Sequence, residues 1–561
     1  MGTAHMNEEL RIAKPAEPAG KGKRSGSGCK AGMVALCALI AMLVLFFHHE
    51  SGSARAELGS HPDEAAHFVT GLMVHDYLTS GFHQSPLSYG DDYYRHYPKI
   101  GLGNWPPLFY IMQALWSAIF GTGVVAVLRL MEGLGVAVAL LTGWWLRREL
   151  GWMEACAGAV LLTALPLVQQ YTNMVMAEML CALLMFGAAG FFALYLEGGE
   201  GRWAVSFGVC AGLAIMAKGT GLALVMVPAF AILFTGRFEL LKWPSLWGAA
   251  LIAAVIAGPW TWHFRNTGRG GWEEASPSAH FAQAAVIYYG REMCVALGWL
   301  LAALAVAGAV SIFLPRQRRP AIAVCSLALV LAVWIFQSVT PVGLEARHLT
   351  AAMPALIVLA MTGFHAITER RPGARAGLGA ALLLVFFGWP SIFHPAGLAP
   401  GYGSLGSQVA LSPFRIPSKE WSGFRPIAQE IIAVGLDNPV LVASDARGEG
   451  MLIAEVAARD RHRPSFTIER ASKLLASSTW SGSGYQSFYK TPEEVRAALA
   501  KAGISMVVMD ASPENLPLHD VLLMETIATQ GGAALLQRSD AVRDGKVTAG
   551  GIQLSSFEAA R

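Results

Sequence analysis

The chain has 561 residues, of which 54% are hydrophobic and only 14% are charged, and its mean hydropathy is +0.44. Soluble domains usually carry about 25% charged residues, so this composition excludes an ordinary water-soluble protein and favours a polytopic membrane protein. The net charge of +3 says little about partners, and nucleic acid is not indicated, because no dense basic stripe occurs beyond the N-terminal tail.

The N-terminal residues 1–30 are polar, small and basic, which is typical of a disordered cytoplasmic tail. The apolar run that follows resembles a signal peptide in layout, but we interpret it as a retained first membrane helix. Spanning a bilayer takes about 20 apolar residues, and the sequence predicts about eleven spans. The predicted spans are 31–47, 123–146, 152–168, 179–196, 203–217, 220–235, 244–263, 293–314, 320–338, 349–368 and 376–393.

The loops between these spans predict the orientation. With a cytoplasmic N-terminus, one set of short loops holds a cluster of arginines and lysines, and the positive-inside rule places that set in the cytoplasm. Its members are Arg147, Arg148, Arg202, Arg237, Lys242, Arg316, Arg318, Arg319, Arg370, Arg371 and Arg375. An odd number of spans then places the C-terminal region outside.

The predicted outer segments are long. The loop 48–122 is rich in His, Tyr, Trp and Asp, so we expect it to be folded, with the apolar run 106–120 lying at the membrane surface. A second outer loop covers about 264–292. The chain thus divides into a membrane domain, 31–395, and an extracytoplasmic domain, 400–561.

The C-terminal domain has the pattern of a small α/β fold. NPVLVASD (438–445) and ISMVVMD (504–510) are typical of buried strands, and MLIAEVAARD (451–460) is typical of a helix. TPEEVRAALAKAG (491–503) predicts a helix with a capping box formed by Thr491 and Glu494. No glycine-rich phosphate loop follows either strand, so no nucleotide is assigned.

Two acids are candidates for chemistry on the predicted outer side. Asp63 lies in HPDEAAH (61–67), where Pro62 suits a first helical turn and acids complement the helix dipole. An ordinary acidic helix start remains the alternative. Glu178 lies where an outer loop enters a predicted membrane helix, and an ionisable residue at that depth is costly and often functional. The alternative is that Glu178 lies just above the hydrocarbon, in water.

Basic residues occur on the same predicted side: Arg95, Lys99, Arg129, Lys218, Arg265, Arg269, Arg291 and Arg347. Lys218 lies between two apolar runs with almost no loop, and Arg347 lies at a helix entry. An anionic partner such as a lipid phosphate would account for cations at membrane depth. Snorkelling of single side chains to the interface is the alternative.

The order of these motifs resembles the GT-C glycosyltransferases, in particular bacterial relatives of protein O-mannosyltransferases and of the lipid A aminoarabinose transferase. The resemblance covers roughly residues 30–395 and rests on HPDEAAH, NWPPLFY (104–110), VLRLMEGLGVAVAL (127–140), NMVMAEM (173–179), AKGTGLAL (217–224) and EARHL with MPAL (345–356). It implies that Asp63 is the catalytic acid of the first outer loop. Lys218 and Arg347 match basic positions near the donor phosphate.

Two positions depart from the pattern of this family. Several relatives have a lysine directly before Pro-Pro, where this chain has Trp105, and Lys99 is the candidate substitute. The second acid is often Asp, and here it is Glu178. The resulting predicted site has Asp63 and Glu178 as catalytic residues. Its predicted substrate-binding residues are Glu64, His67, Lys99, Lys218, Arg265, Arg291, Arg347 and His348.

The expected reaction is inverting transfer of a sugar from a polyprenyl-phosphate donor to an extracytoplasmic acceptor, with Asp63 as general base. The departing phosphate needs positive charge rather than a strong acid. The acceptor could be a protein, a glycolipid or a polysaccharide. No cofactor is required by the sequence, and a divalent metal joining Asp63 and Glu178 stays open. The alternative is a transporter or flippase for a polyprenyl-linked or other lipid, although no internal repeat is present.

Overall fold

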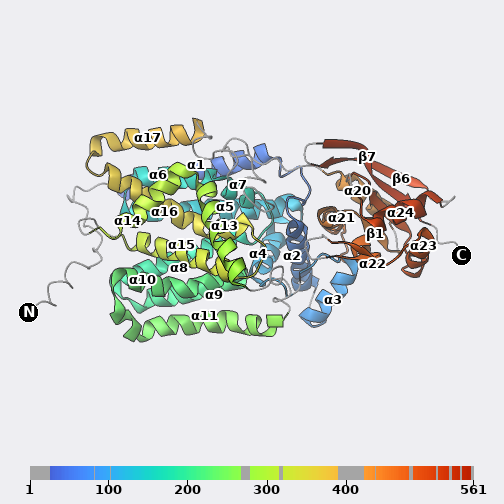
Figure 1. The fold of residues 1–561 in the computed structure, drawn as a ribbon, viewed down its shortest axis with the longest axis horizontal. Coiled ribbons are helices and arrows are strands. Elements are labelled where there is room, and N and C mark those ends of the chain that lie inside the picture. Colours follow the sequence, from blue (N-terminus) through green and yellow to red (C-terminus); the bar gives the residue numbers. More distant parts are fainter. Residues whose placement is uncertain are drawn as a thin grey trace, which may run out of the picture.

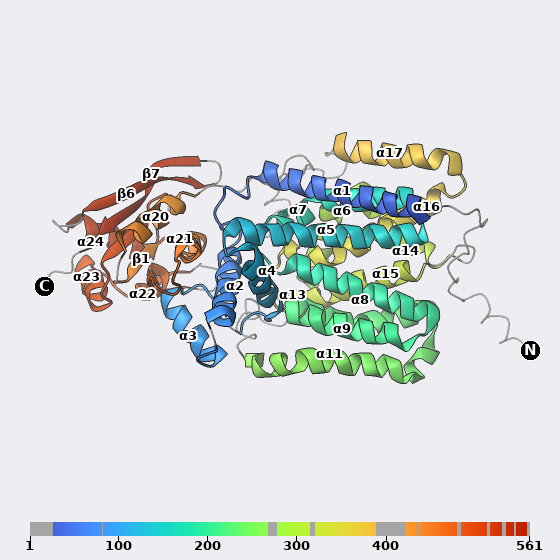
Figure 2. The same ribbon diagram turned by 180° about the vertical axis from the view of Figure 1, so that it is seen from behind.

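The computed structural model describes residues 26–80, 82–101, 103–266, 278–314, 320–388, 422–435, 438–478, 484–512, 516–529, 534–543 and 546–557. Helices of the first 388 residues run side by side in a bundle, and a region with a sheet lies beyond one end of it (Figures 1 and 2). We call the end that faces the sheet the α/β end. The helices α2 and α3 lie between the bundle and the sheet (Figure 2).

The bundle is built from the following α-helices and 3₁₀ turns: α1 (Gly26–Ser51), α5 (Val124–Glu149), α6 (Trp152–Ala164), α7 (Pro166–Thr172), α8 (Glu178–Gly198), α9 (Gly201–Ala217), η1 (Gly219–Val225), α10 (Met226–Thr235), η2 (Phe238–Lys242), α11 (Pro244–His263), α13 (Ala279–Leu297), α14 (Trp299–Ser311), α15 (Ala321–Val339), η3 (Ala346–Ala352), α16 (Met353–Thr368) and α17 (Pro372–Gly388). Together they form a polytopic helical membrane fold, as predicted.

Among the described residues, six helical segments are long and apolar enough to cross a membrane, or eight if each of two bent pairs forms one span. The six are Lys30–Ser51, Val124–Glu149, Glu178–Gly198, Pro244–His263, Ala321–Val339 and Ala346–Thr368. The bent pairs are α6 with α7, at 66°, and α13 with α14, at 110°. The predicted spans 203–217, 220–235 and 376–393 correspond to shorter apolar helices, and residues 389–393 lie outside the described residues.

Three sequence predictions are corrected here. The predicted span 293–314 is interrupted at Gly298, whose φ of 78° ends α13 before α14 begins. Much of the predicted loop 264–292 is helical, because α13 already begins at Ala279 behind the capping residue Ser278. The predicted disordered tail gives way to helix α1 at Gly26, so residues 26–30 belong to the helix, and residues 1–25 lie outside the described residues.

The long connection between α1 and α5 is folded, as its composition predicted. It contains α2 (Pro62–Ser80), α3 (Pro86–His96) and α4 (Leu108–Phe120). α2 begins at Pro62 with Asp63 and Glu64 in its first turn, where acids suit the helix dipole. Most of its first half is buried, because α4 packs on it from the bundle and α21 (Ala446–Arg459) packs on it from the α/β region.

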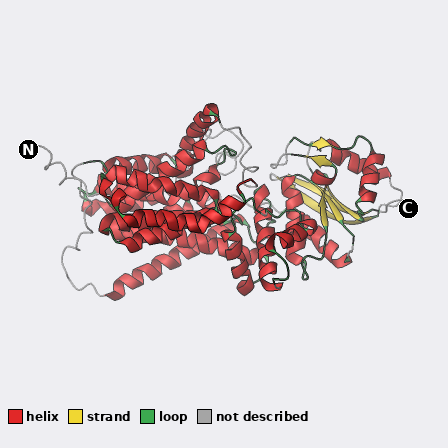
Figure 3. Ribbon diagram, turned by 90° about the horizontal axis from the view of Figure 1, so that it is seen from below, coloured by secondary structure: helices red, strands yellow, loops and turns green. Residues whose placement is uncertain are grey.

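The C-terminal region combines helices with a mixed sheet (Figure 3). The strand order is β2-β1-β5-β7-β6, in which β2, β1 and β5 are parallel and β7 pairs antiparallel with both of its neighbours. Strands β3 and β4 form a separate pair. The strands are β1 (Val440–Ala443), β2 (Ile468–Arg470), β3 (Ala476–Ser477), β4 (Gln486–Ser487), β5 (Met506–Asp510), β6 (Leu535–Arg543) and β7 (Lys546–Ser556).

The helices of this region are α20 (Phe424–Val434), α21, α22 (Ala471–Leu474), α23 (Pro492–Lys501) and α24 (Leu518–Thr529). The predicted capping box at the start of α23 is present, with Thr491 and Glu494 each accepting a hydrogen bond from the other's backbone N–H. The predicted strands and the helix at 451–460 correspond to β1, β5 and α21. The antiparallel hairpin β6–β7 was not predicted.

Small residues allow α21 to approach the bundle closely. A Cβ at Gly450 would lie 2.9 Å from Lys99 Cε and 3.1 Å from Ala65 Cβ, so any larger residue where α21 meets α2 would force the Lys99 side chain to move. Gly59 likewise lies directly against the Met451 side chain. The α/β region is therefore packed against the start of α2.

Buried polar contacts hold this interface together. Arg463 donates two hydrogen bonds to Asp76, from Nε at 2.8 Å and from Nη2 at 3.1 Å. Tyr97 Oη donates to Asp460 Oδ2 at 2.6 Å. The Glu57 carboxylate accepts from backbone N–H groups at the start of α20. Bidentate arginine–carboxylate contacts are strong and geometrically specific, so the orientation of the α/β region relative to α2 is well defined.

Candidate functional site

Two buried acid–base pairs lie at the α/β end of the bundle. Arg347 Nη1 donates to Asp63 Oδ2 at 2.8 Å, and Lys218 Nζ donates to Glu178 Oε1 at 2.5 Å. Electrostatic contact between Arg347 and Glu178 joins the two pairs into one cluster. The structure thus brings together four residues that are up to 284 positions apart in the sequence.

Each of these residues lies at the end of a helical element. Asp63 is in the first turn of α2, and Glu178 is the first residue of α8, where a helix dipole favours a negative charge. Lys218 is the C-cap of α9, where the dipole favours a positive charge. The neighbouring Gly221 lies directly on the backbone of α9 at Ala214, and a Cβ there would clash, which explains the tight KGTG turn after Lys218.

Arg347 is shared between two carboxylates. Its Nε forms an ion pair with Glu345, the residue just before η3, while Nη1 contacts Asp63. Burial alone would raise the pKa of Asp63, but the Arg347 guanidinium outweighs it and holds that pKa well below the usual range. For the same reason the pKa of Glu345 is lowered to about 2. Both carboxylates are ionised at neutral pH.

His67 lies four residues after Asp63 on the same face of α2. Its Nδ1 is 2.7 Å from Tyr110 Oη, and its ring lies 4.4 Å from the ring of Trp105. Burial lowers the pKa of His67 to about 4, so the imidazole is neutral near pH 7. Trp105 therefore packs on His67, at the position where several relatives have a lysine.

The other predicted site residues have different surroundings. Glu64 accepts backbone N–H bonds from Ser60 and Val175, so it ties the start of α2 to the segment before α8. Lys99 Nζ donates to the Ala446 carbonyl of α21 at 3.1 Å, and burial followed by Arg470 lowers its pKa to about 8. Lys99 is thus a contact of the α/β interface, near Asp63 but bonded elsewhere.

The three remaining predictions divide by location. His348 is next to Arg347, and its charged neighbours include Lys218 and Glu178, so it belongs to the cluster. Arg265 is exposed and packs on the Trp262 ring at 4.3 Å, outside the cluster. Arg291 is exposed on α13, in contrast to the buried or half-buried residues of the cluster.

Two residues of the cluster were not predicted. His61 lies 3.6 Å from Asp63 through Nδ1 and 3.5 Å from Glu345 through Nε2. His61 belongs to the HPDEAAH motif and Glu345 to EARHL. Both residues were thus part of the motifs, but neither was predicted to be a site residue. The sequence gives little indication of their role, because His61 lies between the two carboxylates only after distant segments of the chain come together in the fold.

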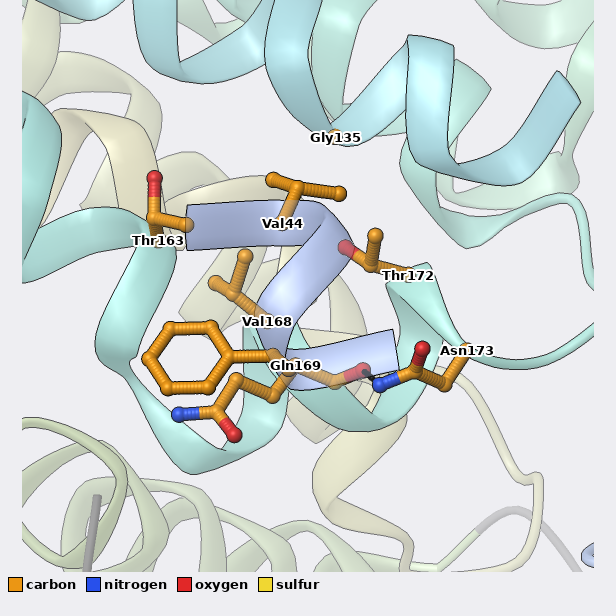
Figure 4. A pocket seen from close by; sticks show the side chains of 8 residues that line it. Val44, Gly135, Thr163, Val168, Gln169, Thr172 and Asn173 are labelled. Atoms are coloured by element: carbon orange, nitrogen blue, oxygen red, sulfur yellow. Dashed lines mark hydrogen bonds between the residues drawn. The ribbon is translucent and has the colours of Figure 1, made fainter. Parts of the chain in front are cut away.

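A metal is not indicated by the described part of the chain, where no group of three or more His, Cys, Asp or Glu side chains could hold one. Asp63 and Glu178 each face a cation of the protein instead. A separate small pocket lies between α1, α5, α6 and α7 (Figure 4). It is lined by Val44, Phe47, Gly135, Thr163, Val168, Gln169, Thr172 and Asn173, and it shares no residue with the acid–base cluster.

Known proteins share the fold and part of the sequence pattern. Residues 104–263 match the family model described as dolichyl-phosphate-mannose-protein mannosyltransferase. No curated protein sequence matches the chain. Among solved structures, the apo form of ArnT from Cupriavidus metallidurans is similar with a TM-score of 0.58 and 15% identity, over 94% of this chain and 98% of that one. ArnT bound to undecaprenyl phosphate gives a TM-score of 0.56 at 15% identity, over 95% and 98%.

The family match covers α4 to α11, which include Glu178 and Lys218, and the structural similarity covers nearly the whole fold, the α/β region included. The chain is therefore a multi-pass membrane protein with the fold of ArnT, and its residues 104–263 are similar to the dolichyl-phosphate-mannose-protein mannosyltransferase family.

Proposed function

We propose that the protein transfers a sugar from a polyprenyl-phosphate donor to an acceptor, with inversion at the anomeric carbon and with Asp63 as general base. The observation that carries this proposal is the Asp63–Arg347 pair, which combines an ionised carboxylate with a cation suited to phosphate. Undecaprenyl phosphate bound to ArnT supports a lipid phosphate as the donor carrier. So does the family description, which names dolichyl-phosphate mannose.

The reaction divides the work between the two pairs. The acceptor oxygen or nitrogen attacks the anomeric carbon, and Asp63 takes its proton. The bond from that carbon to the phosphate oxygen breaks, and its electron pair leaves with the lipid phosphate. Arg347 and Lys218 stabilise the charge that develops on the phosphate. A single base and a departing phosphate imply one displacement, and hence inversion.

The position of Arg347 in the free protein gives donor binding a second role. Its guanidinium now lowers the basicity of Asp63, because the two are paired. A donor phosphate competes for the same guanidinium and draws it from Asp63. Asp63 then becomes a better base at the moment when the sugar is in place.

The proposed orientation puts the α/β end on the outer side of a bacterial inner membrane. Several arginines at the opposite end of the bundle contact oxygen atoms of neighbouring segments. The contacts are Arg148 with Glu197, Arg237 with the Leu196 carbonyl and Arg375 with Glu154. The positive-inside rule supports a cytoplasmic location for that end.

The test is a transfer assay in nanodiscs with a panel of radiolabelled undecaprenyl-phosphate hexoses and pentoses and with membrane acceptors. We expect Asp63→Asn to reduce transfer by about 10²–10⁴-fold. Asp91→Asn, the same change at an exposed position of the same connection, should leave it unchanged. Full activity of Asp63→Asn at normal expression would refute the base assignment. Movement of the lipid across the bilayer without cleavage would favour a transporter.

A further inference from the structure

His61 completes a closed ring of contacts around the proposed base. The ring runs from Asp63 to Arg347, from Arg347 to Glu345, from Glu345 to His61 at 3.5 Å, and from His61 back to Asp63 at 3.6 Å. Arg347 cannot act in proton transfer at neutral pH, because its guanidinium stays protonated. His61 is therefore the group in this ring that can accept a proton from Asp63 and release another.

The hydrogen bonds around His61 define its tautomer. The backbone N–H of Asp63 donates to His61 Nδ1 at 3.1 Å, so Nδ1 carries the lone pair. The neutral ring then carries its proton on Nε2, and this nitrogen faces Glu345 Oε2. The Nδ1 lone pair accepts from the Asp63 backbone and Nδ1 lies 3.6 Å from the Asp63 carboxylate, while the N–H faces a second carboxylate. An acceptor nitrogen on the Asp63 side and a donor nitrogen on the Glu345 side are what transfer of a proton from Asp63 toward Glu345 requires.

Solvent access increases along the same path. The side chain of Asp63 is 10% exposed, that of His61 14% and that of Glu345 19%. A proton that reaches Glu345 is thus at the more accessible end of the path. The other neighbour of Asp63 on α2, His67, is buried and bonded to Tyr110, so it offers no comparable exit.

The general base of a transferase must lose the acquired proton before the next turnover. We propose that His61 accepts this proton from Asp63 and passes a proton on to Glu345 and water. This proposal rests on the proposed function. In the step, the hydrogen bond from the Asp63 backbone N–H to His61 Nδ1 opens, the Asp63 Oδ2–H bond breaks and an Nδ1–H bond forms on His61. The Nε2–H bond then breaks, and the proton moves to Glu345 Oε2 and from there to water, which leaves a neutral ring protonated on Nδ1. Loss of the Nδ1 proton to water and protonation of Nε2 by water then restore the starting tautomer.

The distances suit this role. A separation of 3.6 Å is slightly longer than a hydrogen bond, so transfer proceeds after a small rotation of the ring or through one bridging water. Departure of Arg347 toward the donor phosphate would free Asp63 Oδ2, which Arg347 contacts in the free protein. The relay would then operate when the base is in use.

A purely structural role for His61 is the competing explanation, because the residue immediately precedes α2. The two roles differ in what His61→Ala changes. Loss of a relay lowers kcat and leaves binding of undecaprenyl phosphate intact, because His61 pairs with the carboxylates of Asp63 and Glu345 rather than with the cations that would hold the phosphate. Loss of a structural support would weaken lipid binding as well and would not respond to an added base.

The experiment uses the full chain in nanodiscs and compares wild type, His61→Ala, His61→Asn and Glu345→Gln, with His83→Asn as control. His83 is an exposed histidine in the same connection. We expect His61→Ala and His61→Asn to lower kcat about 10- to 100-fold with KM for the donor within about twofold, and Glu345→Gln to lower kcat less. Added imidazole should restore most of the lost rate in His61→Ala and none in Asp63→Asn.

The outcomes separate this proposal from the proposed function. If wild type transfers sugar, Asp63→Asn does not, and both His61 variants keep the wild-type kcat, the relay is overturned and the proposed function stands. Reduced kcat without imidazole rescue, or weaker binding of undecaprenyl phosphate in His61→Asn, would also overturn it in favour of a structural role. Wild type that fails to transfer any of the sugars would overturn both proposals.

Discussion

Two buried groups of acids, one in the bundle and one in the α/β region, differ in how many of their carboxylates pair with a cation. At the α/β end of the bundle, Asp63 pairs with Arg347 and Glu178 with Lys218. Each acid there faces a cation. At the carboxyl ends of β1 and β5, Glu449, Asp510 and Asp520 gather within the α/β region, and Arg470 pairs with Glu449.

The difference in charge balance changes the protonation of the acids. In the first group the pKa of Asp63 is well below its usual range, because of Arg347. In the second group burial, followed by Glu449 and Asp510, raises the pKa of Asp520 to about 7. Depth does not distinguish the two groups, since the acids of both are buried. A cation, rather than exposure, therefore keeps Asp63 ionised.

The largest effect should come from removing a cation from the first group. Lys218→Met leaves the Glu178 carboxylate buried without its ammonium partner. Breaking a buried pair in this way costs about 3–5 kcal/mol, so we expect a large fall in Tm. Glu178→Gln combined with Lys218→Met should recover most of the loss. Lys242→Met, at an exposed position, is the matched control. An unchanged Tm in Lys218→Met would show that the pair does not stabilise the fold.

A smaller and opposite effect is expected in the second group. A carboxyl with a raised pKa in the folded state binds a proton more tightly there than in the unfolded chain. Asp520 thus contributes stability below about pH 4, and this contribution is lost as the pH rises through about 7. A tenfold difference in proton affinity between the two states corresponds to about 1.4 kcal/mol of folding free energy. Asp520→Asn should therefore be more stable than wild type at pH 8, and this advantage should vanish by pH 5.

Thermal unfolding of the full chain at the two pH values measures this difference. Glu493→Gln, at an exposed position in α23, provides the control for removing a negative charge. Equal stability of Asp520→Asn and wild type at both pH values would mean that Asp520 is not protonated near neutrality. The contrast between the two groups would then disappear.

Much of the fold could be predicted from the sequence, because hydropathy and capping are local. The run 123–146, the capping box at Thr491 and the strand at 504–510 each carry their own signal. The break at Gly298 was missed, because apolar composition continues across it and only the backbone bends. The hairpin β6–β7 was missed because its strands are partly exposed and irregular, with bulges in their pairing.

The acids and bases of the site could be named from sequence, but their pairing could not. Asp63 and Arg347 come from segments that meet only in the folded bundle. Lys99 and Arg265 show why charge and location alone were insufficient. Both are basic and lie on the predicted outer side, as expected for phosphate-binding residues. In the structure, Lys99 binds the Ala446 carbonyl and Arg265 packs on Trp262. His61 and Glu345 illustrate the converse, since ordinary residues gain a candidate role through contact.

The most direct test of the central claim measures binding of undecaprenyl phosphate to wild type and to Asp63→Asn in nanodiscs. If Asp63 and the lipid phosphate compete for Arg347, the variant should bind the lipid more tightly, by about tenfold for each 1.4 kcal/mol of lost competition, while it no longer transfers sugar. Asp91→Asn should change neither property. Weaker or unchanged lipid binding in Asp63→Asn would contradict the account.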